Sequence, residues 1–357
     1  MIDLVERVIP VLGFLVALTI VAEIGDRAGL FDVTGHWAAR AAKGSVLRLW
    51  LLVVVLATAS TIVLSLDTTA VLLTPVVLAI ARRAGVDRTL FALTTVWLAN
   101  TASLLLPVSN LTNLLALHRF SRLPGHPGYL ELMWRPSLAA IVATVLVTAV
   151  LHRRTLRGQF TATEPAQPHD RFLLVLSAVV CVGLAPFFVS GVTPVYPAAV
   201  AAVVLLVALA WRDRAGLREL KLPWATVVAV VVLFVLVDLA GKHGLTTLLR
   251  TVAGTGDGAV DLLRLAASSA GLANVGNNLP AYLALEPVAD SPVRLAALLI
   301  GVGAGPLITP WASLATLLWH ERLRAVGIDV PWRRYVLWGL LAAPGVVALA
   351  VIPLAWR

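Results

Sequence analysis

The sequence has few charged residues and almost no cysteine. Charged side chains make up 13% of the 357 residues, whereas soluble domains carry roughly 25%. Hydrophobic residues make up 59%, and the mean hydropathy is +0.91. This composition excludes an ordinary soluble domain. The single cysteine, Cys181, excludes an intrachain disulfide and a thiolate cluster.

The sequence also lacks the residue patterns of several function classes. The seven histidines form no metal-ligand spacing, so we expect neither a metal site nor a cofactor. No carboxylate pair, metal-ligand helix or nucleophile–base pair supports an intramembrane enzyme. The net charge of +9 comes from arginines scattered through short loops rather than from one basic face, which argues against nucleic-acid binding.

Long apolar blocks replace the missing charges, and none has the polar face of a soluble helix. Each is long enough, or nearly so, to cross a hydrocarbon layer of about 30 Å. They are Val8–Ile24, Leu49–Val63, Pro136–Leu151, Phe172–Val189, Pro194–Trp211, Trp224–Leu239 and Tyr335–Trp356. The chain is therefore predicted to be an all-α, polytopic membrane protein that moves an ion or a solute.

The basic loops predict the orientation. Three Lys or Arg lie in each of two loops and four in each of three others, together 18 of the 28 in the chain. These loops are Asp32–Arg48, Arg82–Arg88, His152–Arg171, Arg212–Leu222 and His320–Arg334. The positive-inside rule places them in the cytoplasm of a bacterial cell. The polar loop 152–171 divides the chain into an N-terminal half, 1–151, and a C-terminal half, 172–357.

The segment Leu49–Ala81 has a basic loop at both ends, so it is expected to enter and leave on one face. The polar stretch Ser65-Leu-Asp67-Thr68-Thr69 is the place to turn. Each arm of about 16 residues spans roughly 24 Å of helix, which is short for a full crossing. We therefore predict a re-entrant hairpin with its tip inside the membrane. The alternative is two short crossing helices with Asp67 in a surface turn.

The next segment, Thr89–His118, is predicted to be an interrupted helix. Pro107 removes a helical hydrogen bond and disfavours helix at Leu106. Four polar residues, Asn100, Ser103, Asn110 and Asn113, follow one another at i, i+3, i+10 and i+13 on one helical face. That face is expected to point toward protein or water.

The C-terminal half repeats this plan. Ala273–Pro280 is a second polar tip, and Gly301–Leu318 is a second interrupted helix. Setting Pro107 on Pro310 also places Asn110 on Ser313, and the predicted topology gives the two copies opposite orientations. Inverted repeats with breaks at matching positions predict a transport site near the middle of the membrane.

The candidate substrate-binding residues are the neutral polar side chains at the tips and breaks. They are Thr68, Asn100, Ser103, Ser109, Asn110, Asn113, Asn274, Asn277, Asn278, Thr309 and Ser313. Half-helices expected to start near Ser109 and Ser313 would aim their positive ends at the breaks. Because this set contains no Arg or Lys, a small neutral polyhydroxyl solute, or an ion held by carbonyls, fits better than a strongly anionic substrate.

Carboxylates inside a membrane are costly and usually functional. Asp67 is the first candidate for proton coupling, because burial favours the protonated carboxyl; alternatively it caps a half-helix. Glu23 and Asp26 come next, although Glu23 and Arg27, at i and i+4, could form a plain ion pair.

At these residues the sequence resembles the ArsB family of arsenite and antimonite permeases. That family belongs to a superfamily with divalent-anion/sodium symporters and NhaD-type antiporters. The resemblance covers nearly the whole chain. It is carried by Ala22–Phe31, Leu64–Pro75, Trp97–Leu115, Ala273–Pro280 and Gly303–Trp319. Ser65–Thr69 and Asn274–Asn278 occupy the places where symporter relatives carry Ser-Asn-Thr tips, and the altered tips argue against sodium coupling and dicarboxylate transport.

The resemblance implies export of trivalent arsenic or antimony hydroxide, driven by inward protons and sometimes aided by an ATPase partner. With Cys181 alone, three-thiolate binding is excluded, so hydrogen bonds would have to recognise the hydroxyls. Two scaffold helices that precede Val8–Ile24 in the family are missing from this N-terminal half. Those helices would help hold a homodimer, so the resemblance leaves the oligomeric state open.

Two other transport functions remain as alternatives. One is a sodium- or proton-coupled transporter of another small solute, such as an organic acid. The other is a passive channel, but paired re-entrant hairpins suit alternating access better.

Overall fold

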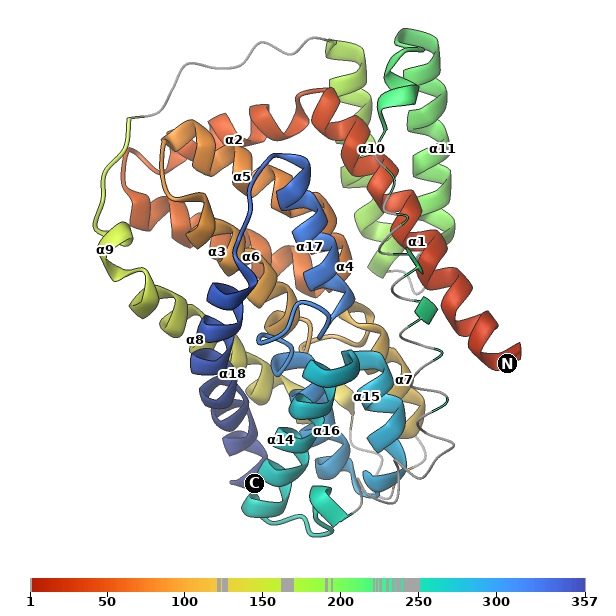
Figure 1. Cartoon of the computed structure of the whole chain (residues 1–357), viewed down its shortest axis with the longest axis vertical. Helices are drawn as coiled ribbons and strands as arrows, with labels where there is room; N and C mark the ends of the chain where they lie inside the picture. The colour runs from red at the N-terminus through yellow and green to blue at the C-terminus, as the bar shows by residue number, and fades with distance from the viewer. Residues whose placement is uncertain are drawn as a thin grey trace.

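The computed structural model of the chain is helical wherever it is described, apart from turns, loops and one β-bridge between Ser45 and Gln159 (Figure 1). It describes residues 2–120, 123, 128–161, 170–189, 192–193, 195–220, 222, 224, 227–228, 231–232, 235, 239 and 251–356. Most of the predicted helix Trp224–Leu239 lies outside these residues.

The helices follow the predicted segments closely. Those of the N-terminal half are α1 (Ile2–Arg27), α2 (Leu30–Ala41), α3 (Val46–Leu64), α4 (Leu66–Thr68), the π-helical turn η1 (Thr69–Leu73), α5 (Thr74–Ala84), α6 (Arg88–Ala102), the 3-10 turn η2 (Pro107–Ser109), α7 (Leu111–Phe120) and α8 (Tyr129–Leu151). The linker carries α9 (Arg153–Leu156). Those of the C-terminal half are α10 (Arg171–Val189), α11 (Val195–Arg212), η3 (Gly216–Glu219), α14 (Ala259–Gly276), α15 (Asn278–Leu285), η5 (Glu286–Val288), α16 (Pro292–Ala304), α17 (Leu314–Ala325) and α18 (Trp332–Ala355).

Within the described part of the chain, three helices are long and apolar enough to cross a membrane: α8, α11 and α18. Parts of α3 and α10, together with α16, form shorter apolar helices. Side chains of α16 are buried from Arg294 to Ala304, so this helix is enclosed by protein on all sides. A helix that is apolar all round and buried belongs to the interior of the bundle.

The helices begin and end where local chemistry predicts. The Ser45 hydroxyl accepts a hydrogen bond from the Arg48 amide at the start of α3, and the Asp87 carboxylate accepts one from Thr89 at the start of α6. Such N-caps satisfy amides that have no partner inside the helix. Gly85 ends α5 with φ of 64°, a conformation that costs glycine little.

Two groups of helices make up the bundle. On one side α1 packs against α10 and α11, and on the other α8 packs against α18 and α14 against α16 (Figure 1). A continuous core of buried apolar side chains joins both groups, running from Leu18 in α1 to Leu354 in α18. A second core cluster holds the start of α3, the end of α5 and α6 together, through residues such as Val46, Ala84 and Phe91.

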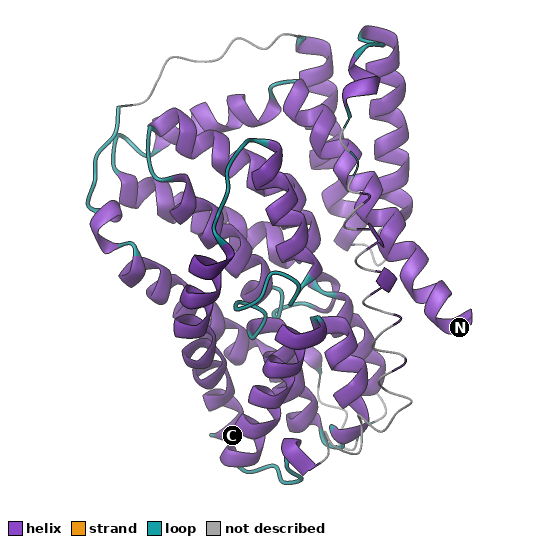
Figure 2. Ribbon diagram, viewed as in Figure 1, coloured by secondary structure: helices purple, strands orange, loops and turns teal. Residues whose placement is uncertain are grey.

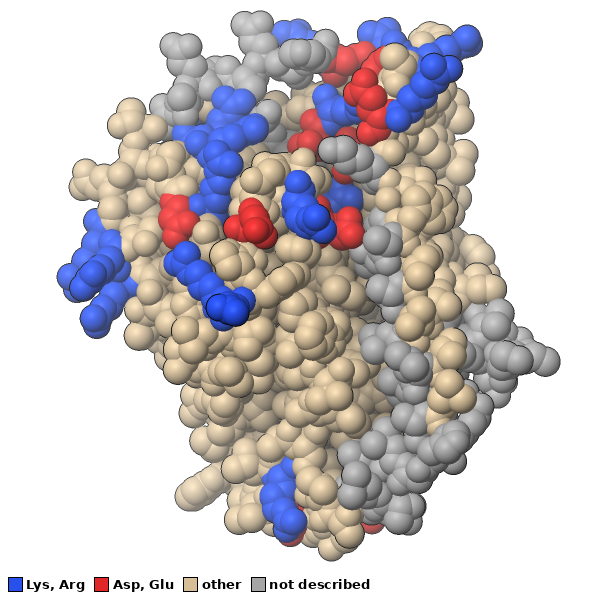
Figure 3. Space-filling model, in the orientation of Figure 1, with Lys and Arg blue, Asp and Glu red and all other residues tan. Residues whose placement is uncertain are grey.

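The charged side chains gather toward one end of the molecule, and a broad uncharged band lies below them (Figure 3). All five basic segments meet there through the linker. Gln159 of the linker bridges Ser45, Asp170 binds Arg212 at 2.8 Å, and His152 shares a cavity with Asp87 and Arg334. This grouping is what the positive-inside rule requires if that end faces the cytoplasm.

Loops also lie in the middle of the bundle, not only at its two ends (Figure 2). They include residues 103–110 and 305–313, which interrupt the helices that the sequence marks with Pro107 and Pro310. Irregular backbone at this depth needs protein partners, because lipid offers none. The partners that it finds define the candidate site.

We expect the substitution Gly339→Ala in α18 to destabilise the protein, because α18 passes directly against the second interruption. A β-carbon at Gly339 would overlap the backbone of Leu307 and Ile308. Overpacking of this kind costs typically 1–3 kcal/mol, which is about the loss expected. Thermal unfolding of the purified protein in detergent should show a lower midpoint.

The matched control is Gly345→Ala, on the same helix. Its added β-carbon meets no atom within 4 Å. The change should leave the midpoint unchanged or raise it, since alanine favours helix over glycine. Equal midpoints for the two variants would contradict the close approach of α18.

Candidate functional site

The first polar tip is a sharp backbone reversal at Ser65. Ser65 has φ of 99°, which is rare for a residue other than glycine. Its hydroxyl accepts a hydrogen bond from the Thr68 amide at 3.3 Å and so caps α4. After this reversal, α4 and η1 pack back against α3. We refer to the segment from α3 to α5 as the first hairpin.

Hydroxyl groups bind the two arms of this hairpin to each other beside the tip. Thr69 in η1 pairs with Ser60 at 3.0 Å and with Thr61 at 3.1 Å, both in α3. Ser65 pairs with Thr68 at 3.0 Å. These bonds fix the tip, and none of them involves the Asp67 side chain.

Asp67 lies in the first turn of α4, where the positive end of a helix stabilises a carboxylate. Its Oδ1 atom is buried and has no hydrogen-bond partner. Buried polar atoms are nearly always hydrogen-bonded, so this open oxygen distinguishes Asp67 from the other residues of the tip. Ser65 rather than Asp67 occupies the capping position of α4, and Asp67 lies two residues later with a buried carboxyl oxygen.

The first interruption separates α6 from α7. Asn113 of α7 reaches back and donates to the carbonyls of Ser103 and Leu106, at 2.7 and 3.2 Å. The Ser103 hydroxyl donates to the carbonyl of Asn100 at 2.7 Å, and Asn110 donates to Ser103 at 3.5 Å. The four predicted residues therefore do come together. They meet across the interruption rather than along one continuous helical face, because α6 ends at Ala102.

The second half of this helix starts at Leu111, two residues later than expected. Pro107, Val108 and Ser109 form a 3-10 turn instead, and Asn110 is extended with φ of −152°. The Asn110 side chain accepts a hydrogen bond from the Thr112 amide at 3.2 Å. Ser109 donates to the carbonyl of Ile62 at 2.7 Å, which ties the interruption to α3 just before the first tip.

The second polar tip repeats the backbone of the first. Asn277, between α14 and α15, has φ of 82° and ψ of 151°, and Ser65 has φ of 99° and ψ of 162°. The Asn277 side chain accepts from the Leu279 amide at 3.4 Å and donates to the Trp311 carbonyl at 2.9 Å. The amide of Asn278 donates to the Ala312 carbonyl at 2.9 Å. The second tip is thus bound to the second interruption.

Asn274 binds three backbone groups at the second interruption and one in its own helix, α14. Its amide nitrogen donates to the carbonyls of Ala270 and Gly305, both at 2.8 Å. Its side-chain oxygen accepts from the amides of Ile308 and Thr309, at 3.2 and 3.0 Å. A single side chain therefore pairs with both donors and acceptors that the broken helix leaves open.

Other predicted residues complete this arrangement. The Thr309 hydroxyl and the Trp311 indole donate to the Asn274 carbonyl, at 2.7 and 2.9 Å. Ser313 has φ of −142° and caps α17 by accepting from the Thr316 amide at 3.2 Å. Ser313 and Asn110 thus have the same extended backbone, each directly before the second half of a broken helix.

Both tips pack against α17. α4 and η1 of the first hairpin contact it, and Asn278 of the second binds Ala312 just before it. Leu279 of the second tip also packs with Leu115 of α7 and Leu314 of α17. A helix of 12 residues is about 18 Å long, so the two tips lie within that span along its axis. The structure does not place Asp67 and Asn277 at opposite ends of the molecule.

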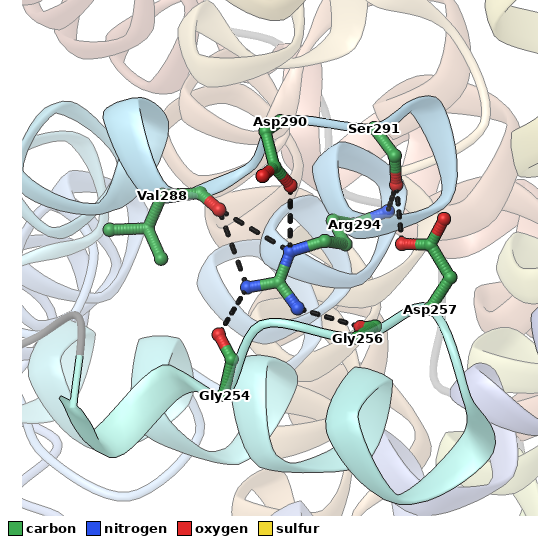
Figure 4. A network of polar contacts seen from close by, with 7 residues as sticks. All are labelled: Gly254, Gly256, Asp257, Val288, Asp290, Ser291 and Arg294. Carbon is green, nitrogen blue, oxygen red and sulfur yellow. Dashed lines mark hydrogen bonds and ion pairs between the residues drawn. The ribbon is translucent and has the colours of Figure 1, made fainter.

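Arg294 holds the base of the second hairpin together (Figure 4). Its buried guanidinium donates to the carbonyls of Gly254 and Gly256, which precede α14, at 2.7 and 2.8 Å. It also donates to Val288, which follows α15, at 3.3 Å, and pairs with Asp290 at 3.2 Å. The segment before α14 and the segment after α15, which begin and end the second hairpin, are therefore both hydrogen-bonded to the start of α16.

The predicted Glu23–Arg27 ion pair is wrong. Glu23 accepts instead from Arg322 of α17 at 2.8 Å, and both side chains are largely buried. Arg27 turns outward and pairs with Asp213, at 3.4 Å, and with Glu219. The local i, i+4 pair is replaced because α17 brings a second arginine against α1. Asp26 lies on the exposed surface of α1.

Sequence reasoning missed three of these contacts. Arg322 resembled any other arginine of a basic loop, and its partner Glu23 is 299 residues away. Trp311 stands beside Pro310 and could have been chosen as a donor near a break. Arg294 carried a signal as well, because an arginine inside an apolar helix needs several acceptors. In the described part of the chain, no group of three His, Cys, Asp or Glu side chains could hold a metal ion.

Comparison with known proteins gives one family and several relatives. The family profile described as "Citrate transporter" (CitMHS) matches residues 5–317. The chain is 29% identical to the arsenical pump membrane protein of Yersinia enterocolitica, over 96% of this chain and 85% of that protein. It is 28% identical to the arsenical pump membrane protein of Escherichia coli K12, with the same coverage.

The fold is similar to that of a solved transporter. The YdaH transporter of Alcanivorax borkumensis, whose crystal structure is described as having an unusual topology, superposes with a TM-score of 0.54. The match covers 99% of this chain and 86% of that one, at 16% sequence identity. At this identity the similarity concerns the fold alone.

We expect the substitution Asn274→Ala to loosen the second interruption locally, because the Gly305 carbonyl and the Ile308 and Thr309 amides lose their partner. Each unsatisfied buried group costs about 1–3 kcal/mol. Hydrogen exchange followed by mass spectrometry should show faster exchange in a peptide that contains Ile308 and Thr309. The amides of α7, which Asn274 does not contact, should exchange as in the unaltered protein. Unchanged protection at residues 308–309 would contradict the role of Asn274.

Proposed function

The chain belongs to the CitMHS family of transporters, and from this premise we propose that it exports a neutral trivalent metalloid hydroxide, arsenite or antimonite, in exchange for protons. The chain is an integral membrane protein of the bacterial cell membrane and a transporter. The substrate, the direction of transport and the coupling to protons belong to the proposal. The relatives named as arsenical pump membrane proteins support it.

The observation that carries the proposal is the neutral polar lining of the two interruptions. Asn100, Ser103, Asn110 and Asn113 meet at one, and Asn274, Asn277, Asn278, Thr309 and Ser313 at the other. None of these side chains carries a charge. Two of them, Asn100 and Asn113, keep a buried side-chain oxygen without a partner, and so does the neighbouring Thr112. A solute that presents three hydroxyl groups and no charge can use such atoms as acceptors.

Matching geometry in the two halves supports an alternating-access transporter. Ser65 and Asn277 reverse the backbone in the same unusual conformation, and Asn110 and Ser313 begin half-helices in the same extended one. We interpret the two hairpins as re-entrant and the two halves as an inverted repeat. Discontinuous helices at matching positions are typical of midplane sites in secondary transporters.

Asp67 is the group that we assign to proton coupling. Its carboxyl sits at the tip of the first hairpin with one oxygen buried and unpaired. If the proton leaves toward the cytoplasm while the solute binds, and returns from outside after the solute has left, the two move in opposite directions. Glu23 is a weaker candidate, because its carboxylate is held by Arg322. Asp26 is weaker still, since it lies on the surface.

A second candidate function is transport of an organic anion. It is favoured by the description of the family profile as a citrate transporter. Tricarboxylates are recognised by cationic side chains, of which Arg is the best suited to bind carboxylate in a bidentate way. The polar residues described at the two interruptions include no Arg or Lys, and Asp67 would repel an anion. A homodimer and an ATPase partner remain predictions of the family resemblance.

Transport by the purified protein in proteoliposomes tests the proposal. With an inward proton gradient, we expect arsenite and antimonite to be exported, and the flux to stop when an ionophore removes the gradient. Sodium and citrate should give no flux above that of empty liposomes. Proton-dependent citrate flux without arsenite flux would overturn the metalloid assignment in favour of the organic anion.

The substitution Asp67→Asn should abolish exchange while the protein still folds, because the amide keeps the shape of the side chain and cannot carry a proton. We expect at least a hundredfold loss of proton-driven arsenite flux, as for removal of a positioned acid or base. The matched control is Asp329→Asn, an exposed carboxylate before α18, which should transport normally. Flux that remains in Asp67→Asn and still depends on the proton gradient would remove Asp67 from the mechanism.

A further inference from the structure

A cavity of about 580 Å³ lies at the charged end of the molecule, away from the two interruptions. Its walls come from the end of α8, from α9 and from the start of α18, together with Asp87 before α6. Three of the five basic segments therefore meet around one space. Neither the proposed substrate nor the proton pathway uses this space.

The cavity is strongly basic. Arg153, Arg154 and Arg334 line it, and Asp87 is its only acidic side chain. Asp87 already caps α6 by accepting from the Thr89 amide at 2.9 Å. No carboxylate within the described ranges forms an ion pair with any of the three arginines. Arg334 lies over the ring of Trp338, 4.3 Å from its centroid, which holds the guanidinium in place.

His152 contributes a buried polar atom that has no partner. The residue is only 6% exposed, its Nδ1 lies 3.3 Å from the Thr148 carbonyl, and its Nε2 is buried without a hydrogen-bond partner. The ring packs edge-on against Trp338, with centroids 5.2 Å apart. A buried nitrogen left open among three unpaired arginines indicates a site for an anion.

One wall of the cavity continues into an apolar surface that runs along α8. Trp134, Leu138, Val142, Leu146 and Val150 follow one another every four residues, so they form one stripe on the helix. All five are 45–66% exposed, and the last one, Val150, lines the cavity. In a membrane protein, an exposed stripe of this kind faces the lipid chains. The basic cavity therefore lies where a lipid-facing surface reaches the polar end of the protein.

We propose that this cavity binds the phosphate headgroup of an anionic phospholipid from the cytoplasmic leaflet, with the acyl chains along the apolar stripe of α8. The three arginines supply the charge, and Trp338 has the amphipathic ring that is enriched at membrane interfaces. A free phosphate ion would use the arginines but not the stripe. An acidic protein partner would need a broad open face, whereas this cavity is bounded by the membrane-spanning helices α8 and α18.

Titration of mixed phospholipids into the detergent-purified full-length protein, followed by native mass spectrometry, tests the proposal. We expect dioleoylphosphatidylglycerol to bind at least tenfold more tightly than dioleoylphosphatidylcholine. The double substitution Arg153→Gln and Arg334→Gln should reduce the affinity for phosphatidylglycerol about tenfold or more, since each cation near a membrane surface contributes to anionic-lipid binding.

The matched control removes two charges from the same end of the molecule but outside the cavity. Arg214→Gln with Arg324→Gln changes two exposed arginines that do not line it, and the lipid affinity should stay within about twofold of the unaltered protein. Equal losses in both double variants would show non-specific attraction and overturn the proposal. Inorganic phosphate at 10-fold molar excess over the lipid should fail to displace it; full displacement would show a free-anion site instead.

The histidine supplies a second readout that a general loss of structure would not reproduce. Burial lowers the pKa of His152, the hydrogen bond to the Thr148 carbonyl opposes that shift, and the charges of Asp87 and Arg334 act in opposite directions. Arg153 and Arg154 line the same cavity. The ring is therefore mostly neutral at pH 8, and a bound phosphate favours the protonated form that can donate from Nε2. Since the phosphodiester stays anionic throughout, lipid affinity should rise between pH 8 and pH 6, and His152→Gln should abolish this rise. A pH dependence that survives in His152→Gln would remove the histidine from the site.

Discussion

A helix broken inside a membrane must find hydrogen-bond partners within the protein, and this constraint organises the whole centre of the molecule. Lipid cannot satisfy the open amides and carbonyls at 103–110 and 305–313. Asn113 donates to carbonyls at the first, and Asn274 both donates and accepts at the second, because a carboxamide carries donors and an acceptor without a net charge. The same amides that allow the helices to break also make the centre polar and neutral.

The same asparagines can therefore hold the broken helices in place or bind a solute, and their position in the bundle does not distinguish the two roles. Asn274 has all of its hydrogen-bonding groups occupied, so it positions the interruption rather than presenting a free group. Asn113 differs, because its amide nitrogen is used and its side-chain oxygen is buried and open. Among the candidate residues, those with an unpaired buried atom are the ones best able to receive a hydroxyl group from a solute.

The sequence was enough to locate the breaks, and it was not enough to describe how they are held. Pro107 and Pro310 predict the interruptions, because proline disrupts a helix. The polar runs at Ser65 and Asn277 predict the reversals of the chain. The start of α7 was misplaced by two residues, because the 3-10 turn at Pro107–Ser109 has no signature of its own. Contacts between distant segments, such as Glu23 with Arg322, depend on the packing of α1 against the far end of the chain, which no local pattern records.

The two hairpins are anchored at their bases by different means. Arg294 fastens the second one from within its own half, whereas the first is held by the linker: Val46 donates to Gly158, and Phe160 donates to Gly44. The described part of the linker is thus paired with the residues that begin α3. The segment that follows the N-terminal half in sequence therefore also stabilises the start of that half's first hairpin, so a change in the linker would be felt at α3.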